Sequence, residues 1–259
     1  MYGAFIGDIV GSRFESKQRG FKSKDFELFT PECRYTDDSV CTIAVFDALQ
    51  LCEGDYTNLS EVVTERFKYY GRRYPHAGYG QAFRMWILSA DDETEPYGSW
   101  GNGAAMRVSP CAWFGRSLEE VKSLAYKVTA VTHNHPEGLK GAEATAVAIY
   151  LARTGATKEA IREAMEKYYQ LDFTLDEVRP WYRFDSSCQG TVPYALQAFF
   201  ESTSFEDAIR NAISLGGDAD TLGAITGSIA EAFYGISEEL IETANRYLGI
   251  KETVRYPTT

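Results

Sequence analysis

One short acidic segment constrains this chain more than any other: residues 216–221, which read GGDADT. The two glycines permit a sharp turn, and a helical pattern of small apolar residues runs from Thr221 to Gly235. Side chains two positions apart do not share a helix face, so Asp218 and Asp220 converge best in an irregular turn that enters this helix. From this segment alone, a simpler interpretation stays open, in which one aspartate only caps the helix.

A second acidic segment, TDDS at residues 36–39, also stands at the start of a helical pattern, which extends from Val40 to Leu51. Ionised carboxylates that lie close together raise one another's pKa unless a cation compensates them. The ligands on offer are all oxygen atoms, which favours Mg²⁺, Mn²⁺ or Ca²⁺ over zinc or copper. If folding brings the two segments together, they suit two metal ions about 3.5–4 Å apart. The alternative is two ordinary capped helices.

The rest of the sequence predicts an all-α protein. Gly3, Gly7 and Gly11 recur on one potential helix face, which allows close backbone approach. About nine segments show helical periodicity and none shows convincing strand alternation, whereas residues 16–34 predict a polar loop or flap and residues 172–194 irregular structure. With 259 residues, 44% of them hydrophobic, and no linker-like segment, we expect a single domain over residues 1–259.

Composition limits the partners and the compartment. The formal net charge is −11 and there is no basic cluster, so nucleic acid is not expected as a general partner. The five cysteines are odd in number and lack CxxC spacing, which argues against a disulfide framework and against a structural zinc site. We expect neither a signal peptide nor a membrane span, and a cytoplasmic location.

Five segments, taken in order along the chain, resemble the ADP-ribosylglycohydrolase family, which includes dinitrogenase-reductase-activating glycohydrolase and the ADP-ribose-arginine and ADP-ribose-serine hydrolases. The resemblance extends from Gly3 to Gly235, and the ordered set is more specific than any one member. The segments are GDIVGSRFE (7–15), TDDS (36–39), GNGAAMRVSP (101–110), THNHPEG (132–138) and GGDADT (216–221).

The resemblance implies an all-helical hydrolase that releases ADP-ribose from an ADP-ribosylated protein or a small-molecule adduct. It implies that Glu15 lies in a mobile flap and moves a proton or guides the attacking water, with Asp37 and Asp218 as further catalytic candidates. It also implies a pair of Mg²⁺ or Mn²⁺ ions. Their implied ligands are Thr36, Asp37, Asp38, Asp218, Asp220 and Thr221.

Substrate-binding residues follow from the same resemblance. The backbone N–H groups of Asn102, Gly103, Ala104 and Ala105 are expected to cradle the diphosphate, which an acidic protein must compensate locally. His133 corresponds to a histidine that contacts the phosphoribose region. Relatives often have glycine or serine in place of the two alanines, so a side-chain contact at those positions is not expected.

Simpler interpretations remain for several of these residues. His133 and His135 could end a helix, where the helix dipole favours a protonated histidine. The segment 101–103 could be only a turn, and Arg107 could be a structural ion-pair partner. A nucleophile–base pair made of Cys111 and His133 has no support in the spacing.

The implied reaction is cleavage of the glycosidic bond of an ADP-ribosyl adduct, with ADP-ribosylarginine as the first expectation. Serine-linked, poly-, O-acetyl- and nucleobase-linked ADP-ribose remain alternatives, because residues 16–35 vary across the family and would face the leaving group. An alternative of a different class is a non-catalytic ADP-ribose-binding or structural protein of the same fold, since fold alone does not determine function.

Overall fold

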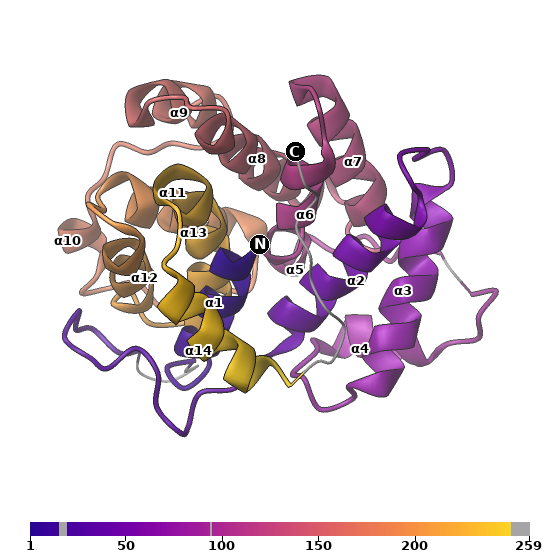
Figure 1. Cartoon of the computed structure of the whole chain (residues 1–259), viewed down its shortest axis with the longest axis horizontal. Coiled ribbons are helices and arrows are strands. Elements are labelled where there is room, and N and C mark those ends of the chain that lie inside the picture. Colours follow the sequence, from indigo (N-terminus) through magenta and orange to yellow (C-terminus); the bar gives the residue numbers. More distant parts are fainter. Residues whose placement is uncertain (16–19, 94, 250–259) are drawn as a thin grey trace.

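The computed structural model describes residues 1–15, 20–93 and 95–249 of the chain. Their regular elements are helices, and the one strand-like pairing among these residues is an isolated bridge between Gly101 and Ser187. This confirms the predicted all-α class (Figure 1). The longer helices are α1 (Tyr2–Gly11), α2 (Asp37–Leu51), α3 (Leu59–Arg73), α4 (Gln81–Leu88), α7 (Leu118–Ala130), α8 (Pro136–Arg153), α9 (Lys158–Met165), α11 (Cys188–Phe200), α12 (Phe205–Ile213), α13 (Ala219–Tyr234) and α14 (Glu238–Leu248).

The described residues form more helices than the about nine that periodicity predicts. The additional elements are short: α5 (Gly103–Met106), α6 (Ser109–Phe114) and α10 (Leu175–Val178). Elements of one or two turns contain too few residues to show a 3.6-residue period. The prediction of irregular structure for residues 172–194 was also partly wrong, because α11 begins inside that segment and contains Pro193.

Helices α1 and α13 pack side by side at the centre of the molecule, although they lie near opposite ends of the sequence (Figure 1). The glycines of α1 make this contact close, as the sequence predicts. A Cβ atom on Gly3 would lie 2.0 Å from the carbonyl oxygen of Gly227, and one on Gly7 would lie 2.0 Å from that of Gly223. Gly11 meets Ala219 in the same way, so the two helices are antiparallel and the end of α1 faces the start of α13.

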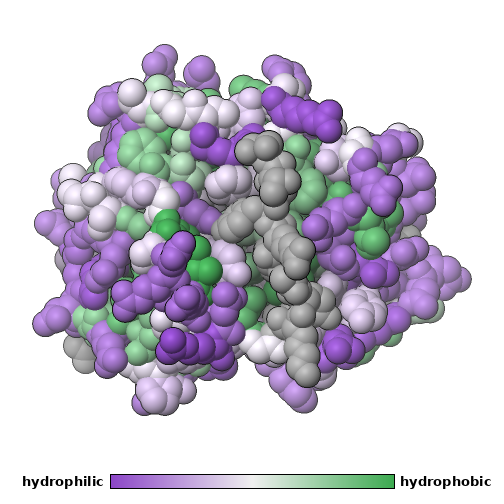
Figure 2. All heavy atoms as spheres, viewed as in Figure 1, coloured by the Kyte–Doolittle hydropathy of each residue, from purple (hydrophilic) through white to green (hydrophobic). Residues whose placement is uncertain are grey.

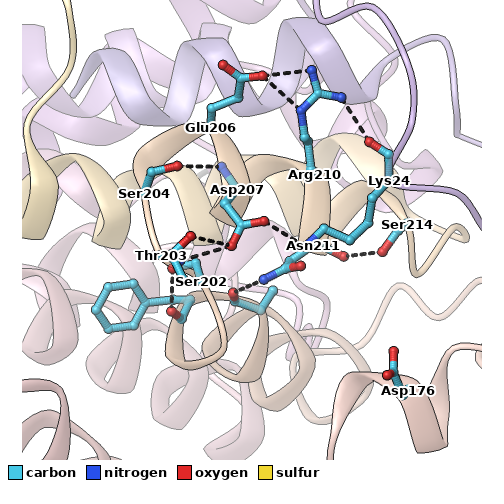
Figure 3. Close-up of polar contacts among 12 residues, drawn as sticks. Lys24, Asp176, Ser202, Thr203, Ser204, Glu206, Asp207, Arg210, Asn211 and Ser214 are labelled. Atoms are coloured by element: carbon cyan, nitrogen blue, oxygen red, sulfur yellow. Dashed lines mark hydrogen bonds and ion pairs between the residues drawn. The ribbon is translucent and has the colours of Figure 1, made fainter.

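The loop that follows α1 is held against α12 (Figure 3). The Lys24 ammonium group is 2.6 Å from the Asp207 carboxylate, and the Arg210 guanidinium donates to the main-chain oxygens of Lys24 and Phe26 at 2.9 and 2.6 Å. Residues 20–34 contain no helix or strand, in agreement with the predicted loop. Residues 16–19 of the predicted flap lie outside the described residues.

The face of the molecule seen in Figure 2 is largely polar. Figure 2 shows hydrophilic residues over most of the visible face, with smaller apolar areas between them. Among the described residues, no helix combines the length and the apolar character needed to cross a membrane. The five cysteines are all free of disulfide bonds.

The α1–α13 contact gives a prediction for stability. Gly7→Ala should lower the free energy of unfolding by about 1–3 kcal/mol, because the added methyl group would force two helix backbones apart. The matched control is Gly80→Ala, since a Cβ atom at Gly80 would meet no atom within 4 Å. That variant should stay within about 0.5 kcal/mol of the unchanged protein. Urea unfolding measures both, and equal stability of the two variants would contradict the close packing.

Candidate metal centre and its cavity

The two acidic segments line one cavity of about 370 Å³. Its wall contains all six residues implied as metal ligands, together with Glu15, Asn102, Gly103 and His133 of the other expected site residues. Further lining residues that sequence reasoning did not single out include Tyr97, Ser99, Phe184 and Ser186.

Two glycines shape the turn that carries Asp218. Gly216 and Gly217 have φ angles of 68° and 73°, in the left-handed region that favours glycine. A Cβ atom on Gly217 would lie 3.0 Å from the carbonyl oxygen of Arg183, so the turn also has no room for a side chain. Helix α13 begins directly after this turn, at Ala219.

Asp218 occupies the N-cap position of α13, but its side chain makes no capping hydrogen bond. Instead, the Asn102 amide donates to Asp218 Oδ2 at 2.7 Å and to Thr191 Oγ1 at 3.1 Å. The capping interpretation is therefore wrong for Asp218. Asn102 holds this carboxylate through its side chain, a role that its sequence position did not reveal.

At the start of α2, capping falls to Thr36, whose Oγ1 accepts a hydrogen bond from the Asp38 N–H at 3.3 Å. The carboxylates of Asp37 and Asp38 are thus not needed to cap the helix. The Thr221 hydroxyl donates to Asp38 Oδ2 at 3.3 Å, across a sequence separation of 183 residues. This contact joins the two acidic segments directly.

Asp8 is a member of the cluster that sequence reasoning missed. It is fully buried in α1, and its carboxylate accepts hydrogen bonds from the N–H and hydroxyl groups of Thr36, at 2.9 and 2.7 Å. The N–H and hydroxyl groups of Ser39 also donate to it. The signal in the sequence was a charged residue inside an apolar, glycine-rich segment, which packing rarely tolerates without partners. Asp8 thus orients the start of α2.

Burial and mutual repulsion raise the pKa values of this cluster. Burial, followed by the charge of Asp8, raises the pKa of Asp37 to about 8. Burial raises the pKa of Asp8 to about 6, although the hydrogen bonds that it accepts act in the other direction. The pKa values of Asp38 and Asp220 are raised well above the usual range, first by burial and then by the neighbouring carboxylates. The cluster is therefore short of positive charge.

The donor set fits a hard divalent cation. Carboxylate oxygens of Asp8, Asp38 and Asp220 lie within 4.8 Å of one another, and Asp38 Oδ1 is buried with no hydrogen-bond partner among the described residues. Buried carboxylate oxygens are normally hydrogen-bonded or bound to a metal. Because Asp8 already accepts four hydrogen bonds, Asp38 and Asp220 are the better candidates for direct ligands.

The segment after Gly101 differs from the expected diphosphate cradle. The N–H of Asn102 donates to Ser186 O at 2.8 Å, that of Ala104 to Gly101 O at 3.1 Å and that of Ala105 to Asn102 O at 2.8 Å. Ala104 and Ala105 are buried and do not line the cavity. Of the four expected N–H donors, only that of Gly103 has no such partner among the described residues, because Asn102 bonds to Ser186 and the two alanines serve the turn into α5.

His133 lies in the cavity wall and is buried. Its pKa is lowered well below the usual value, mainly by burial and then by the charge of Arg107. His133 follows the end of α7 at Ala130, and its N–H donates to Thr129 O at 2.9 Å, but its lowered pKa is opposite to the effect expected for a histidine stabilised by the helix dipole. His135 instead caps α8, where its Nδ1 accepts from the Glu137 N–H at 3.1 Å.

Two other simple interpretations also fail. Arg107 forms no ion pair with a carboxylate among the described residues, so it is not a structural ion-pair partner there. Cys111 is fully buried and does not line the cavity, and burial raises the pKa of its thiol. A Cys111–His133 pair is therefore excluded as a catalytic unit at this cavity.

Glu15 lines the same cavity and is exposed to solvent. Its charge contributes to the raised pKa values of Asp37 and Asp220, which places the carboxylate near both acidic segments. Glu15 also stands directly before residues 16–19, which are outside the described part of the chain. Its implied role in proton transfer stays a prediction.

The raised carboxyl pKa values predict how stability depends on pH. Carboxyl groups of the unfolded chain titrate near pH 4, so between about pH 4 and 8 the metal-free folded protein binds more protons than the unfolded chain. The free energy of unfolding should therefore fall as pH rises from 5 to 8, by about 1.4 kcal/mol per pH unit for each extra proton held.

Thermal unfolding in the presence of a chelator measures this fall. Asp38→Asn is the matched variant, because its neutral amide removes one of the groups that must ionise, and its curve should be flatter. A dependence on pH as steep in this variant as in the unchanged protein would contradict the assignment of the raised pKa values to this cluster.

Comparisons with known proteins identify the family of the chain. The model of the ADP-ribosylglycohydrolase family matches residues 1–248. Human ADP-ribosylhydrolase ARH3 is 25% identical to the chain in an alignment that covers 91% of this chain and 84% of ARH3. The ADP-ribosyl-[dinitrogen reductase] glycohydrolase of Rhodospirillum rubrum is 30% identical over 64% of this chain and 53% of its own length.

Two further comparisons concern a shorter region and the fold. The ADP-ribosylarginine hydrolase Tri1 of Pseudomonas putida is 32% identical over 53% of this chain and 39% of its own length. A solved structure described as an ADP-ribosylglycohydrolase-related protein complex superimposes with a TM-score of 0.68 at 26% identity, over 95% of this chain and 89% of that one. Since the family model spans almost the whole chain, this protein belongs to the ADP-ribosylglycohydrolase family.

Proposed function

We propose that this protein is a metal-dependent hydrolase that cleaves the glycosidic bond of an ADP-ribosyl adduct and releases ADP-ribose. The observation that carries the proposal is the meeting of the two acidic segments in one cavity, through the 3.3 Å contact of Thr221 with Asp38. The names of the relatives support the same class of reaction, since they are described as ADP-ribosylhydrolases or glycohydrolases.

Two Mg²⁺ or Mn²⁺ ions are proposed as the cofactors. Such ions would neutralise the crowded carboxylates and supply Lewis-acid activation of water and substrate. The unpartnered Asp38 Oδ1 and the all-oxygen donor set support a hard cation at this position. The proposed ligands are Thr36, Asp37, Asp38, Asp218, Asp220 and Thr221, all of which line the cavity.

The protein's own groups have distinct tasks in this proposal. As the glycosidic bond breaks, the distal ribose gains oxocarbenium character, which the surrounding carboxylates stabilise electrostatically. Glu15 is exposed at the cavity and is suited to exchange a proton with water or with the leaving group. Asn102 keeps Asp218 in a single orientation through its 2.7 Å hydrogen bond, and His133 offers a ring nitrogen to the bound ligand.

Asp218→Asn tests the proposed chemistry. The variant should lower kcat/KM for release of ADP-ribose by about 100-fold or more, because a neutral amide is a poorer ligand for a divalent ion and stabilises less positive charge. Removal of metal by a chelator should abolish release, and Mg²⁺ should restore it. Asp172→Asn is the matched control, since Asp172 is exposed and does not line the cavity. Full turnover by the metal-free protein would refute the mechanism.

The proposed acceptor is arginine. The Pseudomonas putida relative is named an ADP-ribosylarginine hydrolase, although its match spans only 53% of this chain. Serine-linked, O-acetyl-, poly- and nucleobase-linked ADP-ribose are the competing substrates. Incubation of the protein with each linkage in parallel, with chromatographic detection of free ADP-ribose, should show the arginine adduct turned over with the highest kcat/KM. Faster release from any other linkage would overturn the choice of acceptor and leave the reaction class intact.

A further inference from the structure

Arg107 is a buried cation at the cavity that the proposed reaction does not use. Its side chain is 1% exposed and lines the cavity, and no carboxylate of the described residues lies within ion-pair distance of it. The guanidinium group instead lies over the rings of Phe67 and Phe83, at 4.3 and 5.5 Å from their centroids. Because buried charges are costly unless paired, such an arrangement calls for a functional explanation.

The polar contacts of Arg107 lead to His133. Arg107 Nη2 donates to the Thr132 hydroxyl at 2.6 Å and lies 3.4 Å from His133 Nδ1. Thr132 Oγ1 is in turn 2.8 Å from the same Nδ1 atom. Since a guanidinium group can only donate, the hydroxyl accepts from Arg107 and has its own hydrogen available for Nδ1. The three side chains form a short relay that ends on one ring nitrogen.

These contacts favour one of the two neutral tautomers of His133. A hydrogen on Nδ1 would face the guanidinium group, which has no acceptor, so the geometry favours Nδ1 as the acceptor, with the hydrogen on Nε2. The Nε2 atom faces the turn at residues 101–103: Cβ atoms on Gly101 and Gly103 would lie 3.6 and 3.1 Å from it. No described residue accepts a hydrogen bond from Nε2, which leaves this donor to a ligand in the cavity.

We propose that Arg107 is a positioning residue that acts through Thr132 to hold His133 in the neutral Nε2–H form, with that N–H presented to the anionic part of the ligand. The inference rests on the proposed function, in which the ligand is ADP-ribose and its anionic part is the diphosphate. It also explains why the Arg107 charge has no protein counter-ion: the charge strengthens a donor for phosphate oxygens in a cavity otherwise dominated by carboxylates.

The tautomer can be tested without any ligand. The chain has three histidines, His76, His133 and His135, so long-range ¹H–¹⁵N correlation spectra of the imidazole rings are simple, and His133→Gln assigns the relevant signals. The expected spectrum shows His133 as the neutral Nε2–H form from pH 6 to 8. Detection of the Nδ1–H form, or of a protonated ring over that range, would overturn the inference whatever the substrate is.

The use of Nε2–H by the ligand is tested through Thr132, because replacement of the larger buried Arg107 could prevent folding. Calorimetric titration with ADP-ribose in Mg²⁺ should show about fivefold to tenfold weaker binding for Thr132→Val, the loss expected for one hydrogen bond. Thr132→Ser keeps the hydroxyl and should keep the affinity. Thr129→Val is the matched control, since the Thr129 hydroxyl is equally buried, lies in the last turn of α7 three residues before Thr132, and has no partner among the described residues.

The outcomes separate the two proposals. Unchanged ADP-ribose affinity in Thr132→Val, or equal losses in Thr132→Val and Thr129→Val, would overturn the positioning role while leaving the proposed function in place. If the unchanged protein does not bind ADP-ribose at all, the proposed function fails, and with it the ligand part of the inference, while the ring spectra still decide the tautomer.

Discussion

The contact between α1 and α13 is the constraint on which the candidate site depends. Glycine at Gly3, Gly7 and Gly11 lets the two backbones touch, and the antiparallel arrangement places the end of α1 beside the turn at Gly216. Asp8 then reaches the start of α2, where it organises Thr36 and Ser39. Because these glycines have no side chains, α1, the start of α2 and the start of α13 can meet at one buried position.

The buried acidic cluster destabilises the folded protein when no cation is bound. Four carboxyl groups have raised pKa values because they are buried beside one another, and ionisation at neutral pH works against the folded state when no cation is present. Packing around the cluster is correspondingly strict, with two left-handed glycines in the turn and an amide donor at Asp218. Natural proteins accept such local destabilisation mainly where a site requires it.

Local patterns in the sequence revealed the helices of the site but not their contacts. The patterns that begin at Val40 and Thr221 correspond to α2 and α13. The spacing of the glycines in α1 predicted that this helix packs closely against another backbone. Asp8 was missed because nothing in its own segment shows that it meets α2, a contact across 28 residues or more.

The hydrogen bonds of the residues that line the cavity could not be predicted from the sequence either. Whether the N–H groups of Ala104 and Ala105 are free depends on the single turn of α5, which is too short to leave a periodic signal. The tautomer of His133 depends on Arg107, which is 26 positions away in the sequence. Such hydrogen bonds between distant residues determine which groups are free to bind a ligand and which tautomer a histidine adopts. The spacing of residues along the chain does not predict these hydrogen bonds.

The attachment of residues 20–34 to α12 has a consequence for the diversification of such proteins. The Arg210 guanidinium group donates hydrogen bonds to the main-chain carbonyl oxygens of Lys24 and Phe26. Any amino acid at these two positions would provide the same acceptor. Substitutions at these two positions would therefore keep both main-chain hydrogen bonds, although a change of Lys24 would remove its ion pair with Asp207. The sequence of this loop can thus vary at these two positions while Arg210 continues to hold it against α12, because the two hydrogen bonds use only main-chain atoms of the loop.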